Sequence, residues 1–126
     1  GYFNFELNCI GTLMLWYVPD PENWITDNKP VSAEVADKIR IAPAFDAPIT
    51  EEIDAPCTWT TAYFIPLSVF EHYLGDLREL AGQTWRGNFY KCADGSSHPH
   101  WGAWAPMGEK LSFHNMEIFG TLRFEE

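Results

Sequence analysis

The residue types best suited to chemistry gather in one segment near the end of the chain, residues 98–104 (HPHWGAW). Trp101 and Trp104 lie three positions apart among glycine, proline and histidine, and this composition predicts a loop. The apolar face of an indole matches the C–H face of a pyranose ring, and its N–H supplies a polar edge. Held outward, the two rings would form a platform for a sugar, whereas folded inward they would only plug the loop. The spacing leaves both interpretations open.

The histidines of the same segment raise the question of a metal site. His98 and His100 flank a proline, which favours an extended backbone. An H-x-H pair needs at least one more ligand and outer partners that orient it, and His114 or Asp94 could add to the set. Two loop histidines that make ordinary hydrogen bonds are the simpler interpretation.

Polar side chains alternate along two further segments, 2–9 and 84–92, which both have the period of a strand. If these strands were neighbours in one sheet, their polar faces would merge. Glu6 and Arg86 could then pair, and both could bond the vicinal hydroxyls of a sugar. An ordinary solvated sheet face is the alternative. The polar residues concerned are Asn4, Glu6, Asn8, Arg86, Asn88 and Tyr90.

Catalytic signatures are weak. Glycosidases need two facing carboxylates, and Glu6 with Glu71, Asp94 or Glu117 could in principle supply them, but none lies in a recognisable motif. The chain has no nucleophile elbow, P-loop, dinucleotide fingerprint or EF-hand pattern. The three cysteines form no C-x-x-C pair, which suggests three buried thiols, or one disulfide and a leftover.

The elements that position these residues are mostly strands. Alternation and β-branched or aromatic content predict strands over 2–9, 12–18, 35–42, 58–65, 84–92 and 117–125, the first two forming a hairpin. A short helix is expected over 69–74, with Ser68 as its N-cap and Glu71 completing a capping box, and a further helical turn over 76–80. Long loops fill 19–34, 43–56 and 93–115. The pattern predicts a mostly β fold, an antiparallel β-sandwich with one short helix and long loops.

Composition and charge narrow the function classes. The chain has 126 residues, enough for one domain, and 16% of them are aromatic, unlike a disordered chain. Its formal charge of −10 argues against a nucleic-acid partner. No apolar run is long enough for a membrane span.

Several motifs together carry a family resemblance. The segments 85–91 (WRGNFYK), 100–104 (HWGAW), 113–114 (FH) and 119–122 (FGTL), with 2–8 and 59–66, resemble a family-9 carbohydrate-binding module, in particular the family-9-like proteins of polysaccharide-degrading bacteria. The resemblance implies a β-sandwich that binds oligo- or polysaccharides and is associated with xylanases or other glycan-degrading enzymes. An extracytoplasmic location and, in some members, structural calcium follow from the same resemblance, although no calcium ligands map clearly.

The resemblance also implies roles for individual residues. Trp101 and Trp104 match the loop that supplies a stacking tryptophan, Arg86 and Asn88 match polar strand positions beside it, and Glu6 matches an early acidic position. The candidate carbohydrate-binding set is therefore Glu6, Asn8, Arg86, Asn88, His100, Trp101 and Trp104.

One departure from the family concerns the beginning of the domain. Residues 1–126 resemble a single domain without the family's N-terminal strands, which would leave a sheet edge open, so that a second copy could cover it in a homodimer. Trp16, Trp24 or Trp59 could then provide a second aromatic clamp. The leading expectation is a non-catalytic carbohydrate-binding domain. The alternatives are a glycoside hydrolase that uses Glu6 and a second carboxylate, and a structural or assembly module.

Overall fold

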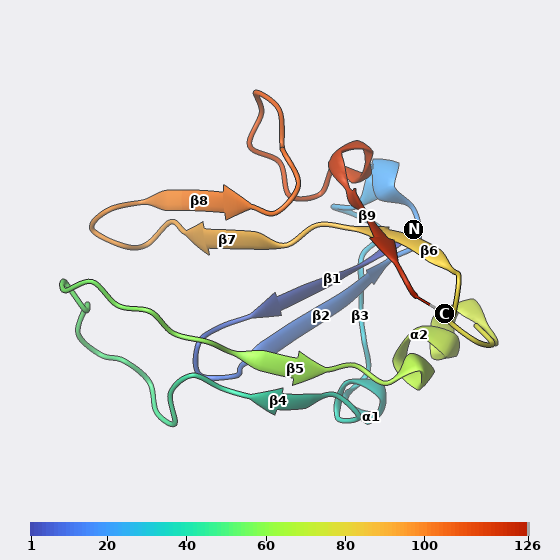
Figure 1. Cartoon of the computed structure of the whole chain (residues 1–126), viewed down its shortest axis with the longest axis horizontal. Helices are drawn as coiled ribbons and strands as arrows, with labels where there is room; N and C mark the ends of the chain where they lie inside the picture. The colour runs from blue at the N-terminus through green and yellow to red at the C-terminus, as the bar shows by residue number, and fades with distance from the viewer. Residues whose placement is uncertain (126) are drawn as a thin grey trace. The chain divides into compact units, whose positions relative to one another are not determined.

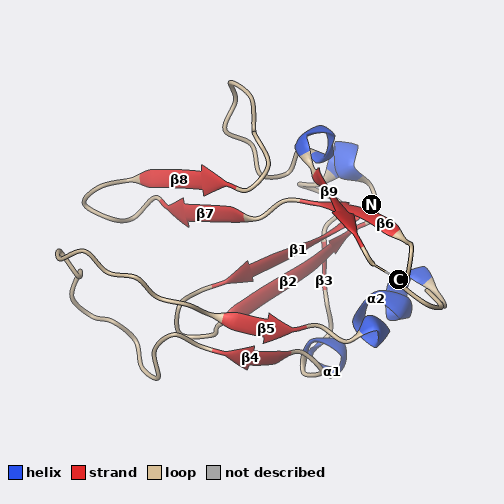
Figure 2. Cartoon of the chain, viewed as in Figure 1, coloured by secondary structure: helices blue, strands red, loops and turns tan. Residues whose placement is uncertain are grey.

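The computed structural model describes residues 1–125, which form two compact units, residues 1–77 and 78–125. Strands dominate both units, and all their pairings are antiparallel (Figures 1 and 2). One main helix, in the first unit, accompanies them. The predicted mostly β, antiparallel class with one short helix is therefore confirmed.

The first unit begins with the predicted hairpin. Strand β1 (Tyr2–Leu7) pairs with β2 (Leu13–Val18) along its whole length, and the short β3 (Lys29–Pro30) joins the other side of β2. The connecting turn is built by Asn8 and Gly11. The Asn8 Oδ1 accepts hydrogen bonds from the backbone N–H of Ile10 (3.2 Å) and Thr12 (2.8 Å). Gly11 has a φ of 84°, which a residue without Cβ adopts at little cost.

The core of the first unit lies where the hairpin meets two helices. Leu15 of β2 packs with Val35 of α1 (Ala33–Ala36), with Ile39, and with Val69 of α2 (Leu67–Leu74), which is completely buried. A layer of aromatic rings adjoins these side chains. Within it the Phe3 ring lies edge-on to Phe70, with centroids 5.2 Å apart. Burying such side chains is the main source of stability for a unit of this size.

Two predicted strands of this unit are shorter than expected. Residues 35–42 do not form one strand, because Val35 and Ile39 are four positions apart and reach the same core, the spacing of a helical turn. Within 35–42 only β4 (Arg40–Ala42) is a strand. It pairs with β5 (Ala62–Phe64), the part of the predicted strand 58–65 that forms a strand.

The main helix begins earlier than predicted. Pro66, with extended backbone angles, is the N-cap of α2, and no side chain caps the helix, so the expected Ser68 cap and its capping box with Glu71 are wrong. Proline suits this boundary because its missing N–H leaves nothing unsatisfied there. Gly75 ends the helix with a φ of 80°, and the predicted helical turn over 76–80 does not form.

The second unit consists of two strand pairs. Strand β6 (Thr84–Gly87) pairs with β9 (Gly120–Arg123), and β7 (Tyr90–Ala93) pairs with β8 (His100–Ala103). The strand predicted over 84–92 is therefore interrupted at residues 88–89, and the loop predicted over 93–115 contains β8. The start of the strand predicted over 117–125 is instead part of a 3-10 turn, Met116–Ile118.

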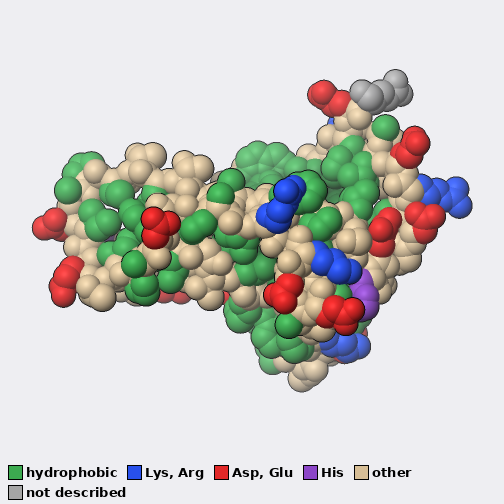
Figure 3. Space-filling model, turned by 90° about the horizontal axis from the view of Figure 1, so that it is seen from below, with side chains coloured by type: hydrophobic (Ala, Val, Ile, Leu, Met, Phe, Trp, Pro, Cys, Tyr) green, Lys and Arg blue, Asp and Glu red, His purple; other side chains and the backbone are tan. Residues whose placement is uncertain are grey.

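The surface reflects the composition. On the face shown in Figure 3, acidic side chains are spread among hydrophobic ones, with few basic side chains between them. All three cysteines are free. Cys57 and Cys92 are exposed and Cys9 is half-buried, so neither three buried thiols nor a disulfide is formed. No helix within residues 1–125 has the length and apolar character needed to cross a bilayer.

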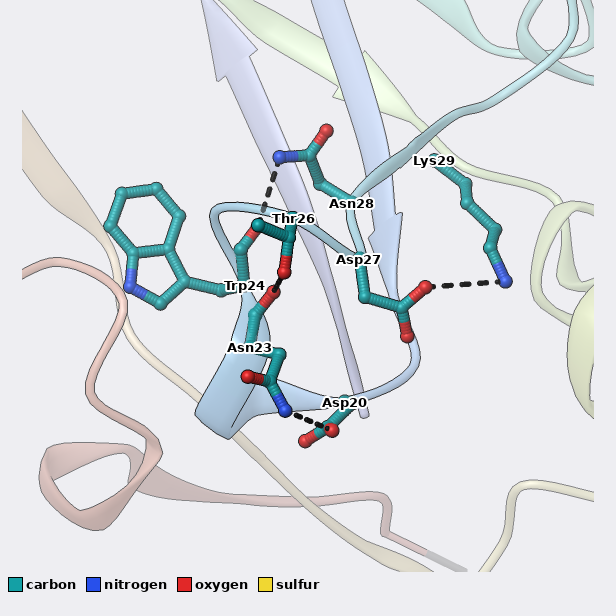
Figure 4. A network of polar contacts seen from close by, with 7 residues as sticks. All are labelled: Asp20, Asn23, Trp24, Thr26, Asp27, Asn28 and Lys29. Carbon is teal, nitrogen blue, oxygen red and sulfur yellow. Dashed lines mark hydrogen bonds and ion pairs between the residues drawn. The ribbon is translucent and has the colours of Figure 1, made fainter.

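The loop that follows β2 is ordered by its own side chains. Asp20 caps the short 3-10 helix Pro21–Asn23 and accepts hydrogen bonds from the Asn23 amide (2.8 Å) and the Glu22 N–H (3.1 Å), which together lower the pKa of its carboxyl group (Figure 4). The Asn28 amide donates to the Trp24 carbonyl at 2.9 Å. These bonds replace the backbone pairing that a regular element would supply.

Candidate functional site

The predicted tryptophans lie on and beside the β7–β8 hairpin. In its register Lys91 pairs with Gly102 and Cys92 with Trp101. The ladder continues one step further, because the Trp104 N–H donates to the Phe89 carbonyl at 2.9 Å. Residues that face each other across an antiparallel pair project to the same side, and successive residues alternate. Trp101 and Trp104, three apart, therefore belong to opposite faces of the hairpin.

One of these surfaces, which we call the Trp104 face, carries an exposed aromatic pair. The Phe89 and Trp104 rings meet edge to face, with centroids 5.7 Å apart and an interplanar angle of 70°. Each side chain is 54% exposed. A Cβ built on Gly120 would lie 2.6 Å from Trp104 Cζ3, so the indole rests directly against the glycine of β9. The residues of the Trp104 face are Phe89, Lys91, Ala93, His100, Gly102 and Trp104.

The same face presents two polar groups beside the rings. The Lys91 ammonium donates to His100 Nε2 at 2.6 Å, and His100 Nδ1 lies 2.8 Å from the His98 carbonyl. Since a carbonyl only accepts, Nδ1 carries the proton, and Nε2 presents its lone pair to the Lys91 ammonium. Between the aromatic pair and His100, Gly102 contributes no side chain.

The opposite surface, the Trp101 face, has a different chemistry. The Trp101 indole N–H donates to the Asp94 carboxylate, and the ring is 45% exposed. Further along β7, Tyr90 stacks on Phe113 with centroids 4.5 Å apart, and burial raises the pKa of the Tyr90 hydroxyl. The polar edge of the Trp101 indole is thus engaged with the protein itself.

Two predicted ligand-binding residues, Arg86 and Asn88, bind the backbone. The Arg86 guanidinium donates to the carbonyls of Glu117 (3.0 Å) and Phe119 (2.9 Å) at the end of the 3-10 turn. The Asn88 amide donates to the Ala105 carbonyl (3.1 Å), and its Oδ1 accepts from the Ala105 N–H (2.8 Å). Asn88 therefore clamps the residue that follows Trp104.

The other predicted residues belong to the first unit. Glu6 accepts a hydrogen bond from the Asn4 amide at 2.8 Å, and Asn8 shapes the β1–β2 turn. Because β1 and β6 belong to different sheets, the condition under which their polar faces would merge, that the two strands are neighbours in one sheet, is not met. A role for Glu6 or Asn8 in sugar binding stays a prediction.

The tryptophans considered for a second clamp differ in exposure. Trp16 lies in β2 opposite Asn4 and is half-buried. Trp59, 46% exposed, precedes β5. Trp24 is 37% exposed and its indole points away from the hydrogen bonds of its loop (Figure 4).

The residues considered as metal ligands do not assemble into a cluster among the described residues. Within residues 1–125 no group of three or more His, Cys, Asp and Glu side chains is placed to hold a metal ion. His98 hydrogen-bonds Ser97 Oγ at 2.8 Å, and His100 has the contacts described above. Both histidines match the simpler interpretation, ordinary hydrogen bonding.

Sequence reasoning missed the residues that complete the Trp104 face. Phe89, Lys91 and Gly102 share a face with Trp104 only because residues 100–103 form a strand in register with β7. The alternation of Phe89 and Lys91 was visible, but the proline and glycine of the partner segment concealed its pairing. Gly120 carried no local signal, since its role depends on a ring 16 positions earlier in the chain.

Comparison with known proteins places the chain in a family. A crystal structure of a "putative carbohydrate-binding protein" from Bacteroides uniformis is similar, with a TM-score of 0.81 and 35% identity over 98% of this chain. The chain spans 55% of that longer protein. The comparison with curated proteins found no match. The sequence model of Carbohydrate-binding family 9 matches residues 1–124, and the chain belongs to that family.

Proposed function

We propose that this protein binds plant-type oligo- or polysaccharides at the Trp104 face, by stacking a sugar ring on Trp104 beside Phe89 and hydrogen-bonding its hydroxyls through Lys91, whose ammonium His100 holds in place. Family membership and the carbohydrate-binding name of the similar Bacteroides uniformis protein support a saccharide partner. The type of glycan and the residues that contact it are what we propose here.

The single observation that carries the proposal is the half-exposed aromatic pair of Phe89 and Trp104. Large apolar rings held at the surface expose area that a partner can bury. The Trp104 ring is fixed by Phe89, by Gly120 and by the Asn88 clamp on Ala105, so little conformational freedom would be lost on binding. The Trp101 face offers one exposed indole, whose N–H is already bonded.

Within this proposal Arg86 and Asn88 are positioning residues. They hold the segments that flank Trp104 through backbone carbonyls rather than presenting their side chains to a sugar. The association with xylanase-type glycan degradation and an extracytoplasmic location, both implied by the family resemblance, belong to the proposal as well. A binding module of this kind would keep an enzyme close to an insoluble glycan by raising its effective concentration.

Isothermal titration calorimetry with xylo- and cello-oligosaccharides tests the proposal. We expect Trp104→Ala to weaken the affinity about tenfold, the loss that corresponds to about 1.4 kcal/mol of aromatic contact. Trp101→Ala is the matched control, because it removes an equally large indole of similar exposure from the other face, and we expect it to bind as wild type.

Circular dichroism spectra of both variants serve as the control for folding, and we expect both to match the wild type. Loss of binding in Trp101→Ala with retention in Trp104→Ala would overturn the choice of face. Absence of heat and of an indole fluorescence change with every glycan tested would overturn saccharide binding itself.

A further inference from the structure

The charge of the Trp104 face is opposite to that of the whole chain. The formal net charge is −10, yet no residue of this face is acidic and one, Lys91, is a cation. The nearest acidic residue along β7 is Asp94, and its carboxylate accepts the indole N–H of Trp101, which belongs to the other face. Lys91 is therefore the one formally charged side chain of the Trp104 face.

The Lys91 ammonium is held in place without being neutralised. The hydrogen-bond partner of its ammonium is the His100 imidazole, and it makes no ion pair with a carboxylate among residues 1–125. An ammonium has three N–H donors, and one of them is directed at His100 Nε2. Two donors and the full positive charge remain for a ligand.

The position of Lys91 suits a substituent on a stacked sugar. Lys91 follows Phe89 by two residues on the same face of β7, which places their Cα atoms roughly 7 Å apart. Across the hairpin, Gly102 contributes no side chain, and even an added Cβ would lie 3.8 Å from Lys91 Cβ. A pyranose on the aromatic pair could thus direct a group at its ring edge over Gly102 toward the ammonium.

We infer that the Trp104 face prefers a saccharide that carries a uronic acid, with the carboxylate bound by Lys91. The inference rests on the proposed function, and it adds the chemical class of the sugar. A carboxylate next to an ammonium makes a charge-assisted hydrogen bond, which is stronger than the bond to a hydroxyl. The overall charge of −10 repels a densely charged polyanion, so the fitting ligand is a neutral chain with isolated uronic acids.

The test uses three matched probes in calorimetry: a xylo-oligosaccharide with one glucuronic acid branch, its carboxyl-reduced counterpart, and the unbranched chain. We expect the uronate to bind about threefold to fivefold more tightly than the reduced form, as an exposed ion pair permits. Added salt should shrink this difference. Lys91→Gln should abolish this difference, and it should weaken binding of the two neutral probes equally, by the loss of one hydrogen bond to a hydroxyl.

Lys110→Gln is the matched control, because it removes the same charge from an exposed lysine elsewhere in the second unit. It should leave the preference intact. Equal affinity for the uronate and its reduced form, or a preference that survives Lys91→Gln, would overturn the uronate inference and leave saccharide binding standing. Failure of all three probes to bind the wild-type protein would overturn the proposed function, and the inference with it.

Discussion

Single polar side chains in this protein hydrogen-bond backbone groups that lie far away in the sequence. Asn88 connects Phe89, Ala105 and Ile118 through both its oxygen and its amide group. Arg86 bridges carbonyls 31 and 33 positions away. Removing such a side chain leaves several half-buried backbone groups without a partner, which costs more than one exposed hydrogen bond.

We therefore expect Asn88→Ala to lower the free energy of unfolding by about 1–3 kcal/mol. Since Ala105 follows Trp104, the same change should also weaken glycan binding. Urea unfolding and calorimetry measure the two effects. Asn4→Ala, which removes an asparagine with one exposed side-chain contact to Glu6, serves as the control and should change stability by less than about 0.5 kcal/mol. Equal stability of the two variants would contradict the clamp.

At the scale of elements, two glycines allow the backbone to turn where a strand or a helix ends. Gly11 closes the β1–β2 hairpin and Gly75 ends α2, and both have positive φ angles. Their surroundings differ. A Cβ on Gly11 would approach Pro43 Cβ at 3.2 Å and Ile41 Cγ2 at 3.3 Å, whereas nothing lies within 4 Å of a Cβ on Gly75.

Both alanine substitutions should therefore be destabilising, for different reasons. Gly75→Ala should cost about 1–3 kcal/mol, because a φ of 80° with a ψ of −173° lies in a region that is essentially restricted to glycine. Gly11→Ala should add about 1–2 kcal/mol of crowding against Pro43 and Ile41 to the strain of its own positive φ. Thermal and urea unfolding of the two variants measure these losses. A loss below about 1 kcal/mol in Gly11→Ala would show that the hairpin turn relaxes easily.

The helices and strands also show how much of the fold could be predicted from the sequence. The β1–β2 hairpin was predictable because its alternation and its turn are local signals, and β6 because its alternation is strict. The helix α1 was missed, since Val35 and Ile39 fit a strand pattern as well as a helical one until their shared core is known. Strand β8 was missed because its composition is typical of a loop, and only pairing with β7 makes it extended.

The candidate site, too, could be predicted only in part. The exposure of Trp101 and Trp104 was one of two open interpretations, and both rings are about half exposed. Their separation onto opposite faces depends on strand register, which a segment taken for a loop does not specify. Arg86 and Asn88 were interpreted as sugar ligands because most of their backbone partners lie 17 or more positions away and leave no local trace.

At the scale of the whole molecule, net charge and unpaired strand edges have opposite effects on association between copies. The net charge is −10, and the sequence pI is about 4.7. Among the described residues, β1 is an end strand of its sheet, and the other sheets have two strands each. End strands carry unpaired backbone groups that a second copy can bind, while strong like charge keeps copies apart.

Self-association should therefore rise as the pH approaches the pI. We expect light scattering to report a larger mean mass at pH 5 than at pH 7.5, because the net charge falls in magnitude near the pI and the repulsion between copies falls with it. The homodimer suggested for an open sheet edge predicts a limiting mass of two chains. Added salt at pH 7.5 should act in the same direction by screening. A mass of one chain under all these conditions would contradict edge pairing.

The exposed thiol of Cys92 has a practical consequence. It lies opposite Trp101 in the hairpin register, on the side turned away from the proposed sugar platform. With Cys57→Ser in place, a maleimide linker would attach the protein to a sensor surface mainly through this position and leave the Trp104 side directed at the sample. The hairpin thus offers an oriented handle for immobilised glycan measurements.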